Sequence, residues 1–385
     1  MTRRRVLMIQ PSFQPPGGGN GVAAWMLEAL RGCHHVGVLT WEPLDLDAMN
    51  RFYGTSVQKA DVTIEPMARW IRTAFDLVPS PIASLKYSLL LQAAAEVAGR
   101  YDLCVSVNNE ADFQRPGVQY IHYPYYQRPR PGTDFSWLHG LPALLRAYYW
   151  SVDRLAGFSA ARMKRNVTLT NSDWTGRMVQ RLHGIPSRTL YPPVPALFPN
   201  VPWDARRQAF LCIGRFAPEK ALDRVIDIVA RVRHAVPDTT LCLVGTPGPP
   251  DYYQQIHKRV REAGGWIRVE ENVSREDLIA LIPTYRYGIH GMAAEHFGMA
   301  PAEMAAAGCI VFVPNDGGQV EIVNRDPRLL YETVDDAVAS ITRVMRDLVE
   351  QQAVREMLLS RARAFSVERF MSSFREVIEQ ALDAT

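Results

Sequence analysis

The sequence is poor in cysteine and has no long apolar run. Its 385 residues include five cysteines, no CxxC and no Cys/His pair at zinc spacing, which excludes a disulfide scaffold. No stretch approaches the roughly 18 apolar residues of a membrane-spanning helix. The basic start MTRRRVLMIQ reaches Pro11 too early for a signal peptide and is expected to form a buried strand. These absences favour a reduced, cytoplasmic protein.

Charge is distributed unevenly along the chain. Residues 1–195 contain 21 Lys and Arg against 14 Asp and Glu, whereas residues 196–385 contain 22 against 26. A basic half suits an anionic substrate or an anionic membrane surface. We expect no nucleic-acid partner. Hydrophobic residues at 47% and charged residues at 22% exclude a disordered or coiled-coil chain.

Short apolar runs alternate with amphipathic stretches in two successive series. Strands are predicted at 5–10, 35–40, 102–107, 118–123 and 166–171, and again at 209–214, 239–245, 266–271, 285–290 and 309–314. Helices are predicted at 20–31, 84–99, 141–163, 220–235, 251–263, 275–282 and 300–307. Two such series predict an α/β protein with two doubly wound, Rossmann-like sheets, each with a crevice at the carboxyl ends of its strands.

A proline-rich connector, LYPPVPALFPNVPWD at 190–204, separates the two series. We therefore predict a first domain at 1–195 and a second at 196–365. Residues 366–385 are predicted to form one amphipathic helix that packs back on the first domain.

Three local patterns suit a phosphorylated ligand. PPGGGNGVAAW (15–25) places glycines between a strand and a helix N-terminus, although a plain turn explains part of this pattern. GRFAPEK (214–220) offers Arg215 and Lys220 at a strand end, where a solvated Arg–Glu pair is the alternative.

The third pattern is HGMAAEHFGMAPAEMAAAGC (290–309). Pro301 suits the first turn of a helix, and Gly298 just before it permits close approach of a phosphate to backbone N–H groups. Glu295 and Glu303 stand eight positions apart, and a carboxylate in the first turn suits the two hydroxyls of a ribose. Stabilisation of the helix dipole is the alternative for Glu303.

His122 and two acidic motifs are the remaining polar candidates. His122 ends an apolar strand, where most histidines are core or rim residues, but its place at a carboxyl end favours function. The Asp-x-Asp of LDLD (44–47) is predicted to lie in a solvated loop and not to bind a metal. SDW at 172–174 is not part of a hydrolase triad, because no GxSxG elbow is present.

Taken together, these motifs resemble the retaining GT-B glycosyltransferases of family four. The similarity extends to YIHYP (120–124), TNSDWT (170–175), LYPPV (190–194) and ENVSREDL (271–278), which look like the α-1,2-mannosyltransferases that extend the dolichol-linked oligosaccharide. The resemblance implies a GT-B fold, a GDP-mannose donor and a glycan or lipid-linked acceptor, as in polysaccharide biosynthesis. We expect no cofactor, and no metal either, because Arg215 and Lys220 can balance the charge of a nucleoside diphosphate.

The resemblance also assigns site residues. It implies that Arg215 and Lys220 bind the donor diphosphate, and that Glu303 binds the ribose. It implies that Glu295, with backbone groups of Phe297, Gly298 and Met299, contacts the donor sugar and the phosphate. The remaining implied contacts are Gly18 and Gly19 with a phosphate, His122 with the sugar at the reaction centre, and Asn272 and Val273 with the base.

The expected reaction is sugar transfer with retention, in which protein cations stabilise the leaving diphosphate and front-face attack replaces a covalent intermediate. Other readings remain open: a UDP-sugar donor, a small-molecule acceptor, a GT-B epimerase or phosphorylase, and a non-catalytic module that binds a sugar nucleotide.

The stretch 68–91 mixes cations with aromatic residues, such as Arg69, Arg72 and Lys86 with Trp70 and Phe75. Such a surface suits peripheral contact with an anionic membrane at its inner face, and an ordinary helix packed on the sheet is the alternative.

Overall fold

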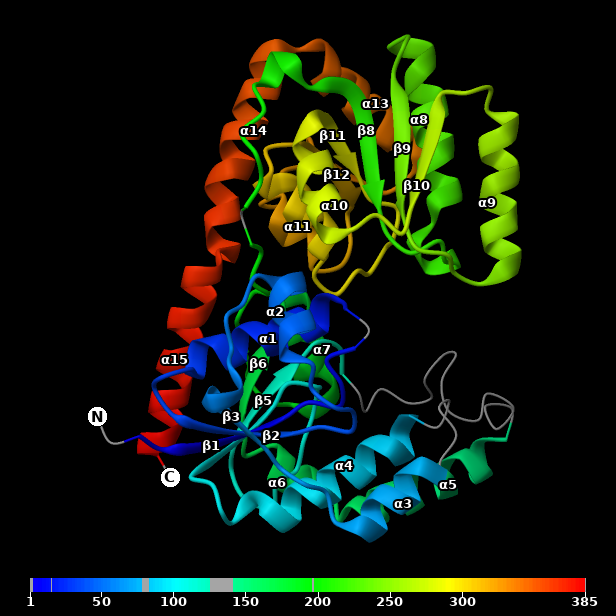
Figure 1. Cartoon of the computed structure of the whole chain (residues 1–385). Helices are drawn as coiled ribbons and strands as arrows, with labels where there is room; N and C mark the ends of the chain where they lie inside the picture. Colours follow the sequence, from blue (N-terminus) through cyan, green and yellow to red (C-terminus); the bar gives the residue numbers. More distant parts are fainter. Residues whose placement is uncertain (1–2, 15, 78–82, 125–140, 196, 385) are drawn as a thin grey trace. The chain divides into compact units, whose positions relative to one another are not determined.

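A computed structural model describes residues 3–14, 16–77, 83–124, 141–195 and 197–384. The chain so described forms two compact units, Met1–Pro193 with Phe370–Thr385, and Val194–Arg369, each with a parallel sheet of its own (Figure 1). The chain passes from the first unit to the second after Pro193, in the proline-rich connector. This is two residues before the predicted boundary.

Within the described residues, the sheet of the first unit has seven parallel strands in the order β3-β2-β1-β4-β5-β6-β7. Its strands are β1 Arg5–Ile9, β2 His35–Leu39, β3 Val62–Ile64, β4 Leu103–Ser106, β5 Val118–Ile121, β6 Val167–Thr170 and β7 Arg188–Thr189. All the predicted strands form. The sequence analysis missed β3 and β7, edge strands of three and two residues that are too short to show a pattern.

Helices surround this sheet. They are α1 Gly18–Leu30, α2 Leu46–Tyr53, α3 Arg69–Leu77, α4 Ala83–Ala98, α5 Pro142–Ala156, α6 Ala160–Met163, α7 Asp173–His183 and, from Phe370 on, α15 Val367–Asp383. The predicted helix at 141–163 is divided between α5 and α6, because Gly157 ends α5 in the left-handed region at φ 60°.

Two polar segments turn out to be helix starts. The prediction of a solvated loop at LDLD (44–47) is wrong, because α2 begins inside it. The Asp45 side chain caps α2 by accepting a hydrogen bond from the backbone N–H of Ala48 at 2.9 Å. In SDW, Ser172 caps α7 in the same way and accepts from the N–H of Thr175 at 3.1 Å.

Among the described residues, the second sheet has six parallel strands in the order β10-β9-β8-β11-β12-β13. Its strands are β8 Arg207–Ile213, β9 Thr240–Gly245, β10 Ile267–Glu271, β11 Tyr285–Ile289, β12 Ile310–Pro314 and β13 Leu330–Tyr331. Its helices are α8 Leu222–Ala235, α9 Pro250–Glu262, α10 Arg275–Leu281, α11 Met299–Ala306, α12 Gln319–Ile322, α13 Val334–Arg346 and α14 Leu348–Ala362. Every strand predicted for this series forms, and the two-residue β13 was missed.

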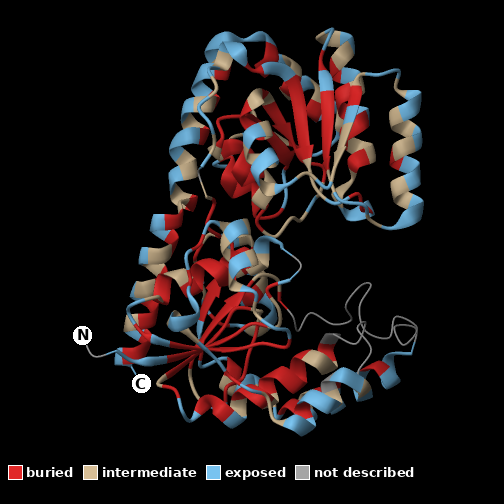
Figure 2. Ribbon diagram, viewed as in Figure 1, coloured by how far each residue is buried: buried red, intermediate tan, exposed pale blue. Residues whose placement is uncertain are grey.

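The cores follow from the continuous apolar runs. Helices cover both faces of each sheet, so a central strand is buried on both faces and shows no polar alternation. All five residues of β12 are buried, and Val6 to Ile9 of β1 have no exposed surface. Figure 2 shows this as buried strands lined by helices whose outer faces are exposed.

The last helix, α15, packs on the first unit. Phe374 is fully buried, the Arg375 Nε donates to the carbonyl of Ala29 at 2.6 Å, and His34 and Glu379 lie 3.2 Å apart. Within the described residues, no helix combines the length and the apolar content needed to cross a membrane.

Candidate active site

An ion pair lies at the carboxyl edge of the second sheet, where the strand order reverses between β8 and β11. The Lys220 Nζ donates to the Glu295 Oε2 at 2.6 Å. Lys220 belongs to the turn after β8, and Glu295 belongs to the loop after β11. The ion pair therefore joins the segments that follow two neighbouring strands. Reversal points of this kind are where doubly wound sheets bind ligands.

His290, at the end of β11, is a third member of this cluster that the sequence analysis missed. It is 2% exposed, and its Nε2 lies 3.2 Å from the Glu295 Oε2. Burial lowers the pKa of His290 more than Glu295 raises it, so the ring is neutral near pH 7. Burial alone would raise the pKa of Glu295, but the hydrogen bond with His290 and the charge of Lys220 outweigh it and hold that pKa well below its ordinary value.

Acidification is expected to destabilise the second unit through His290. Because the pKa of folded His290 lies below its ordinary value of 6.5, the unfolded chain takes up the proton first, and stability falls as the pH drops through 6.5. The loss reaches about 1.4 kcal/mol per pH unit for one proton. Glu295 adds a loss only below its ordinary pKa of 4.5.

Urea unfolding of the wild type and of His290→Gln between about pH 8 and pH 5 tests this. Glutamine can still donate to Glu295 but does not titrate, so the variant should show the shallower dependence on pH. Equal slopes would mean that folded His290 is protonated.

The loop that holds Glu295 is fixed through its backbone. The N–H of Gly318 donates to the Glu295 carbonyl at 2.7 Å. Gly317 has φ 85°, and a Cβ there would lie 2.3 Å from the same carbonyl oxygen, so this close approach requires glycine. Gly298 follows at φ 105° and caps α11, whose first N–H groups begin with Met299. Phe297 is buried against Phe365 with ring centroids 5.4 Å apart.

Glu303 lies one turn into α11 and is 8% exposed. Its Oε1 lies 2.9 Å from the Arg275 Nη2, at the start of α10. Arg275 was not singled out in the sequence. It stands three residues after Asn272, which adopts φ 53° and donates its N–H to the Gly245 carbonyl at 2.9 Å. Asn272, Val273 and Glu303 are therefore connected through the short loop and helix that carry Arg275.

Arg215 is placed differently from Lys220. Its guanidinium pairs with Glu219 at 2.6 Å, and both side chains are about half exposed, at 59% and 45%. The structure therefore contains the solvated Arg–Glu pair that was the alternative for this motif. It does not bring Arg215 into contact with Glu295.

In the first unit, the glycine loop and His122 come together. Gly18 begins α1, the first helix after β1, and His122 follows β5. A Cβ on Gly19 would lie 3.5 Å from the His122 Nε2, so the imidazole lies against this glycine. The loop is held by Tyr53, whose hydroxyl accepts from the Gly17 N–H at 2.8 Å.

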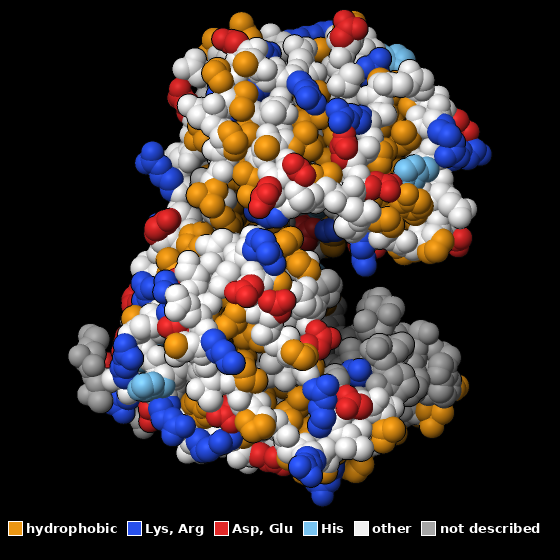
Figure 3. Space-filling model, in the orientation of Figure 1, with side chains coloured by type: hydrophobic (Ala, Val, Ile, Leu, Met, Phe, Trp, Pro, Cys, Tyr) orange, Lys and Arg blue, Asp and Glu red, His pale blue; other side chains and the backbone are white. Residues whose placement is uncertain are grey.

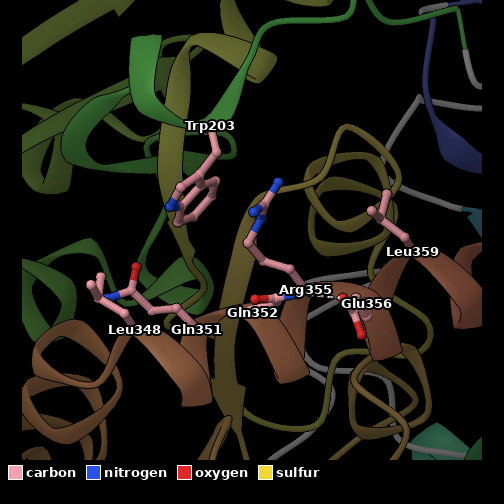
Figure 4. A pocket seen from close by; sticks show the side chains of 7 residues that line it. All are labelled: Trp203, Leu348, Gln351, Gln352, Arg355, Glu356 and Leu359. Atoms are coloured by element: carbon pink, nitrogen blue, oxygen red, sulfur yellow. Dashed lines mark hydrogen bonds between the residues drawn. The ribbon is translucent and has the colours of Figure 1, made fainter.

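A separate pocket of about 350 Å³ lies in the second unit near the amino end of β8. Arg355 rises from α14 beside the ring of Trp203, with its guanidinium carbon 4.0 Å from the ring centroid (Figure 4). The other lining residues are Leu348, Gln351, Gln352, Glu356 and Leu359. None of the predicted site residues lines this pocket. Over the described parts of the chain, no three His, Cys, Asp or Glu residues gather as metal ligands would.

Two doubly wound parallel sheets of this topology form the GT-B fold. Residues 195–365 match the model of the family Glycosyl transferases group 1.

Curated relatives are similar at lower identity. The GDP-Man:Man(3)GlcNAc(2)-PP-Dol alpha-1,2-mannosyltransferase of Neurospora crassa is 24% identical over 318 residues, which cover 69% of this chain and 56% of the relative. The human protein of the same name is 24% identical over 238 residues, covering 56% and 48%. The chain thus spans about half the length of these relatives.

Solved structures share the fold. Sucrose-phosphate synthase of Thermosynechococcus elongatus matches with a TM-score of 0.71 and 17% identity over 100% of both chains. HepE of Anabaena, solved with UDP and glucose, matches with a TM-score of 0.67 and 16% identity over 98% of this chain and 100% of its own. At such identities the likeness establishes the fold alone.

Proposed function

We propose that this protein is a retaining glycosyltransferase that moves mannose from GDP-mannose to a hydroxyl of a glycan or lipid-linked acceptor without a metal. The observation that carries the proposal is the pairing of Lys220 with Glu295 where the strand order reverses between β8 and β11, within the residues that match the transferase family. The names of the curated relatives support mannose as the sugar and a lipid-linked acceptor.

In this proposal the second unit binds the donor. Lys220 and the N–H groups at the start of α11 face the diphosphate and stabilise the charge that develops on it as the glycosidic bond breaks. Glu303, steadied by Arg275, accepts hydrogen bonds from the ribose hydroxyls, and the backbone of Asn272 and Val273 contacts the base. Arg215 would exchange its exposed partner Glu219 for the diphosphate.

Glu295 acts on the transferred sugar. The low pKa of Glu295 keeps it ionised as an acceptor for sugar hydroxyls while it also holds Lys220 in place. A carboxylate already engaged by a lysine and a histidine is a poor covalent nucleophile, which favours front-face attack with a donor phosphate oxygen as the base. His122, with Gly18 and Gly19, contacts the sugar and its phosphate.

The donor is decided by a binding and turnover screen. Thermal shifts should be largest with GDP-mannose, and release of free GDP should increase when a mannosyl acceptor is added. A preference for UDP-glucose would favour the second candidate function, a transferase that uses a UDP-sugar. This candidate is suggested by HepE, which was solved with UDP and glucose. Binding of a sugar nucleotide without any turnover would identify a non-catalytic module instead.

Activity is expected to persist in EDTA. Lys220 and the start of α11 supply positive charge of the kind that a divalent cation supplies in other transferases. The assay compares turnover with EDTA and with added Mg²⁺ or Mn²⁺. Complete loss that Mg²⁺ or Mn²⁺ reverses would contradict the metal-independent mechanism.

We further propose reversible contact between α3 and the inner face of an anionic membrane. Trp70 is 51% exposed and Leu77 is 78% exposed, next to the exposed cation of Arg69. Arg72 is engaged instead with Asp76 at 3.3 Å, and the side chain of Phe75 lies outside the described residues. The edge of the molecule where α3 and α5 lie shows hydrophobic and basic side chains together (Figure 3).

Liposome sedimentation tests this contact. The wild type should sediment with vesicles rich in anionic lipid at low salt and be released as salt rises, because each cation near such a surface contributes about 1 kcal/mol. Trp70→Ala combined with Arg69→Gln should weaken sedimentation, whereas Arg181→Gln on α7 should not. If the wild type does not sediment with these vesicles at low salt, the proposed membrane contact is wrong.

A further inference from the structure

The backbone of His122 is held on both sides by asparagine side chains. The Asn109 Oδ1 accepts hydrogen bonds from the N–H of His122 at 2.9 Å and from the N–H of Tyr123 at 3.0 Å. The Asn171 Nδ2 donates to the His122 carbonyl at 2.9 Å. The N–H and the C=O of this one residue are therefore both bound by side-chain amides.

The sheet explains why these amides are needed. β5 lies between β4 and β6, Asn109 follows β4, and Asn171 follows β6. His122 stands just beyond β5, where the regular pairing with its neighbours ends. The two amides bind the peptide groups of His122 from both sides where strand pairing no longer does, and so keep the end of β5 in a fixed position.

Asn109 suits its position in two respects. It adopts φ 69°, a left-handed conformation that asparagine tolerates better than most residues other than glycine. Glycine would fit this backbone but would offer no acceptor. The position thus combines a backbone requirement with a hydrogen-bond requirement.

The ring of His122 is confined as well. It meets the ring of Tyr120 edge to face, with centroids 4.9 Å apart, and Tyr120 is fully buried with its hydroxyl donating to the Leu190 carbonyl at 2.8 Å. On another side the imidazole lies against Gly19. A shift of the His122 backbone would therefore move the Nε2 relative to the glycine loop.

We propose that Asn109 and Asn171 are positioning residues that fix His122 for its action on the transferred sugar. This inference rests on the proposed function of His122. A displacement of about 1 Å at a reacting group lowers turnover by up to about a hundredfold, so loss of either amide contact should reduce kcat while leaving the affinity for the donor nucleotide unchanged.

The same isosteric substitution at the two positions should have opposite results. Asn109→Asp keeps an acceptor for both N–H groups and should retain kcat within about threefold. Asn171→Asp replaces the side-chain amide that donates a hydrogen bond by a carboxylate that faces the His122 carbonyl. We expect kcat to fall on the order of ten- to a hundredfold. Asn109→Gly keeps the backbone conformation, removes only the acceptor, and should resemble Asn171→Asp.

Double variants separate positioning from a general loss of stability. Combined with His122→Ala, neither Asn109→Gly nor Asn171→Asp should lower kcat further, because each acts through His122. Losses that add fully to that of His122→Ala would overturn the inference. Wild-type kcat in both Asn109→Gly and Asn171→Asp would also overturn it.

A spectroscopic readout keeps this test independent of the reaction. The chain has nine histidines, and the ¹³C-labelled His122 signal is identified by its loss in His122→Ala. That signal should stay in place in Asn109→Asp and move or broaden in Asn171→Asp and Asn109→Gly. If no donor supports transfer, the proposed function fails. An unmoved His122 signal in both Asn171→Asp and Asn109→Gly contradicts the positioning of His122 by Asn109 and Asn171.

Discussion

Lys220→Ala is expected to lower kcat by about a hundred- to a thousandfold, equivalent to about 3 kcal/mol of transition-state stabilisation. The ammonium is held 2.6 Å from Glu295, and the Lys220 side chain is 23% exposed. The ammonium is therefore oriented before the donor arrives and stabilises charge on the leaving diphosphate. Glu295 keeps its contact with His290, so the variant should remain folded. The measurement is steady-state turnover together with the melting temperature.

Lys258→Ala provides the matched control. Lys258 belongs to the same unit, is 70% exposed and pairs loosely with Glu262 at 3.8 Å. Its removal should leave turnover unchanged. Arg215→Ala is expected to reduce turnover in the manner of Lys220→Ala, because its guanidinium can exchange the exposed Glu219 for the diphosphate. Near-normal turnover in Lys220→Ala would end the assignment of this site to the diphosphate.

Glu295→Gln and Glu303→Gln are expected to fail in different ways. Glu303 contacts a part of the donor that does not change during the reaction, so its variant should bind both donor and free nucleoside diphosphate about tenfold or more weakly, with kcat nearly preserved. Glu295 faces the transferring sugar and orients Lys220, so its variant should lose about a hundredfold in kcat with a smaller change in nucleotide affinity.

Calorimetric titration with free GDP, compared with steady-state kinetics, separates the two effects. Arg275→Ala should follow Glu303→Gln, since Arg275 holds that carboxylate at 2.9 Å. Identical patterns of loss in Glu295→Gln and Glu303→Gln would show that the proposed division of roles is wrong.

The sequence predicts a strand wherever burial on both faces requires a continuous run of apolar residues. β12 is apolar along its whole length, and β1 is apolar after Arg5, because helices cover both faces. The edge strands β3, β7 and β13 carry no such mark, because two or three residues show no periodicity. The acidic segment LDLD, inside which α2 begins, has the composition of a loop, since a capping aspartate and a solvated aspartate look alike without the backbone around them.

The site was predictable only as far as strand ends can be located. Lys220 and Glu295 were candidates because each follows a strand of the second series, and the structure brings their side chains to 2.6 Å. Their roles toward the donor stay predictions. His290 and Arg275 were missed because their importance lies in partners brought from other elements, and nothing in their immediate neighbours indicates this. The engagement of Arg215 with Glu219 likewise depends on the local turn.

The return of α15 to the first unit has a consequence for how the protein is made. Residues Phe370–Thr385 complete a unit whose other part ends at Pro193, so the first unit is discontinuous in the chain and the second is continuous. During synthesis the second unit has all of its residues before the first unit has its last helix. Until α15 emerges, the surfaces that bury Phe374 and pair with Glu379 remain uncovered. Final assembly of the first unit therefore follows the synthesis of α15.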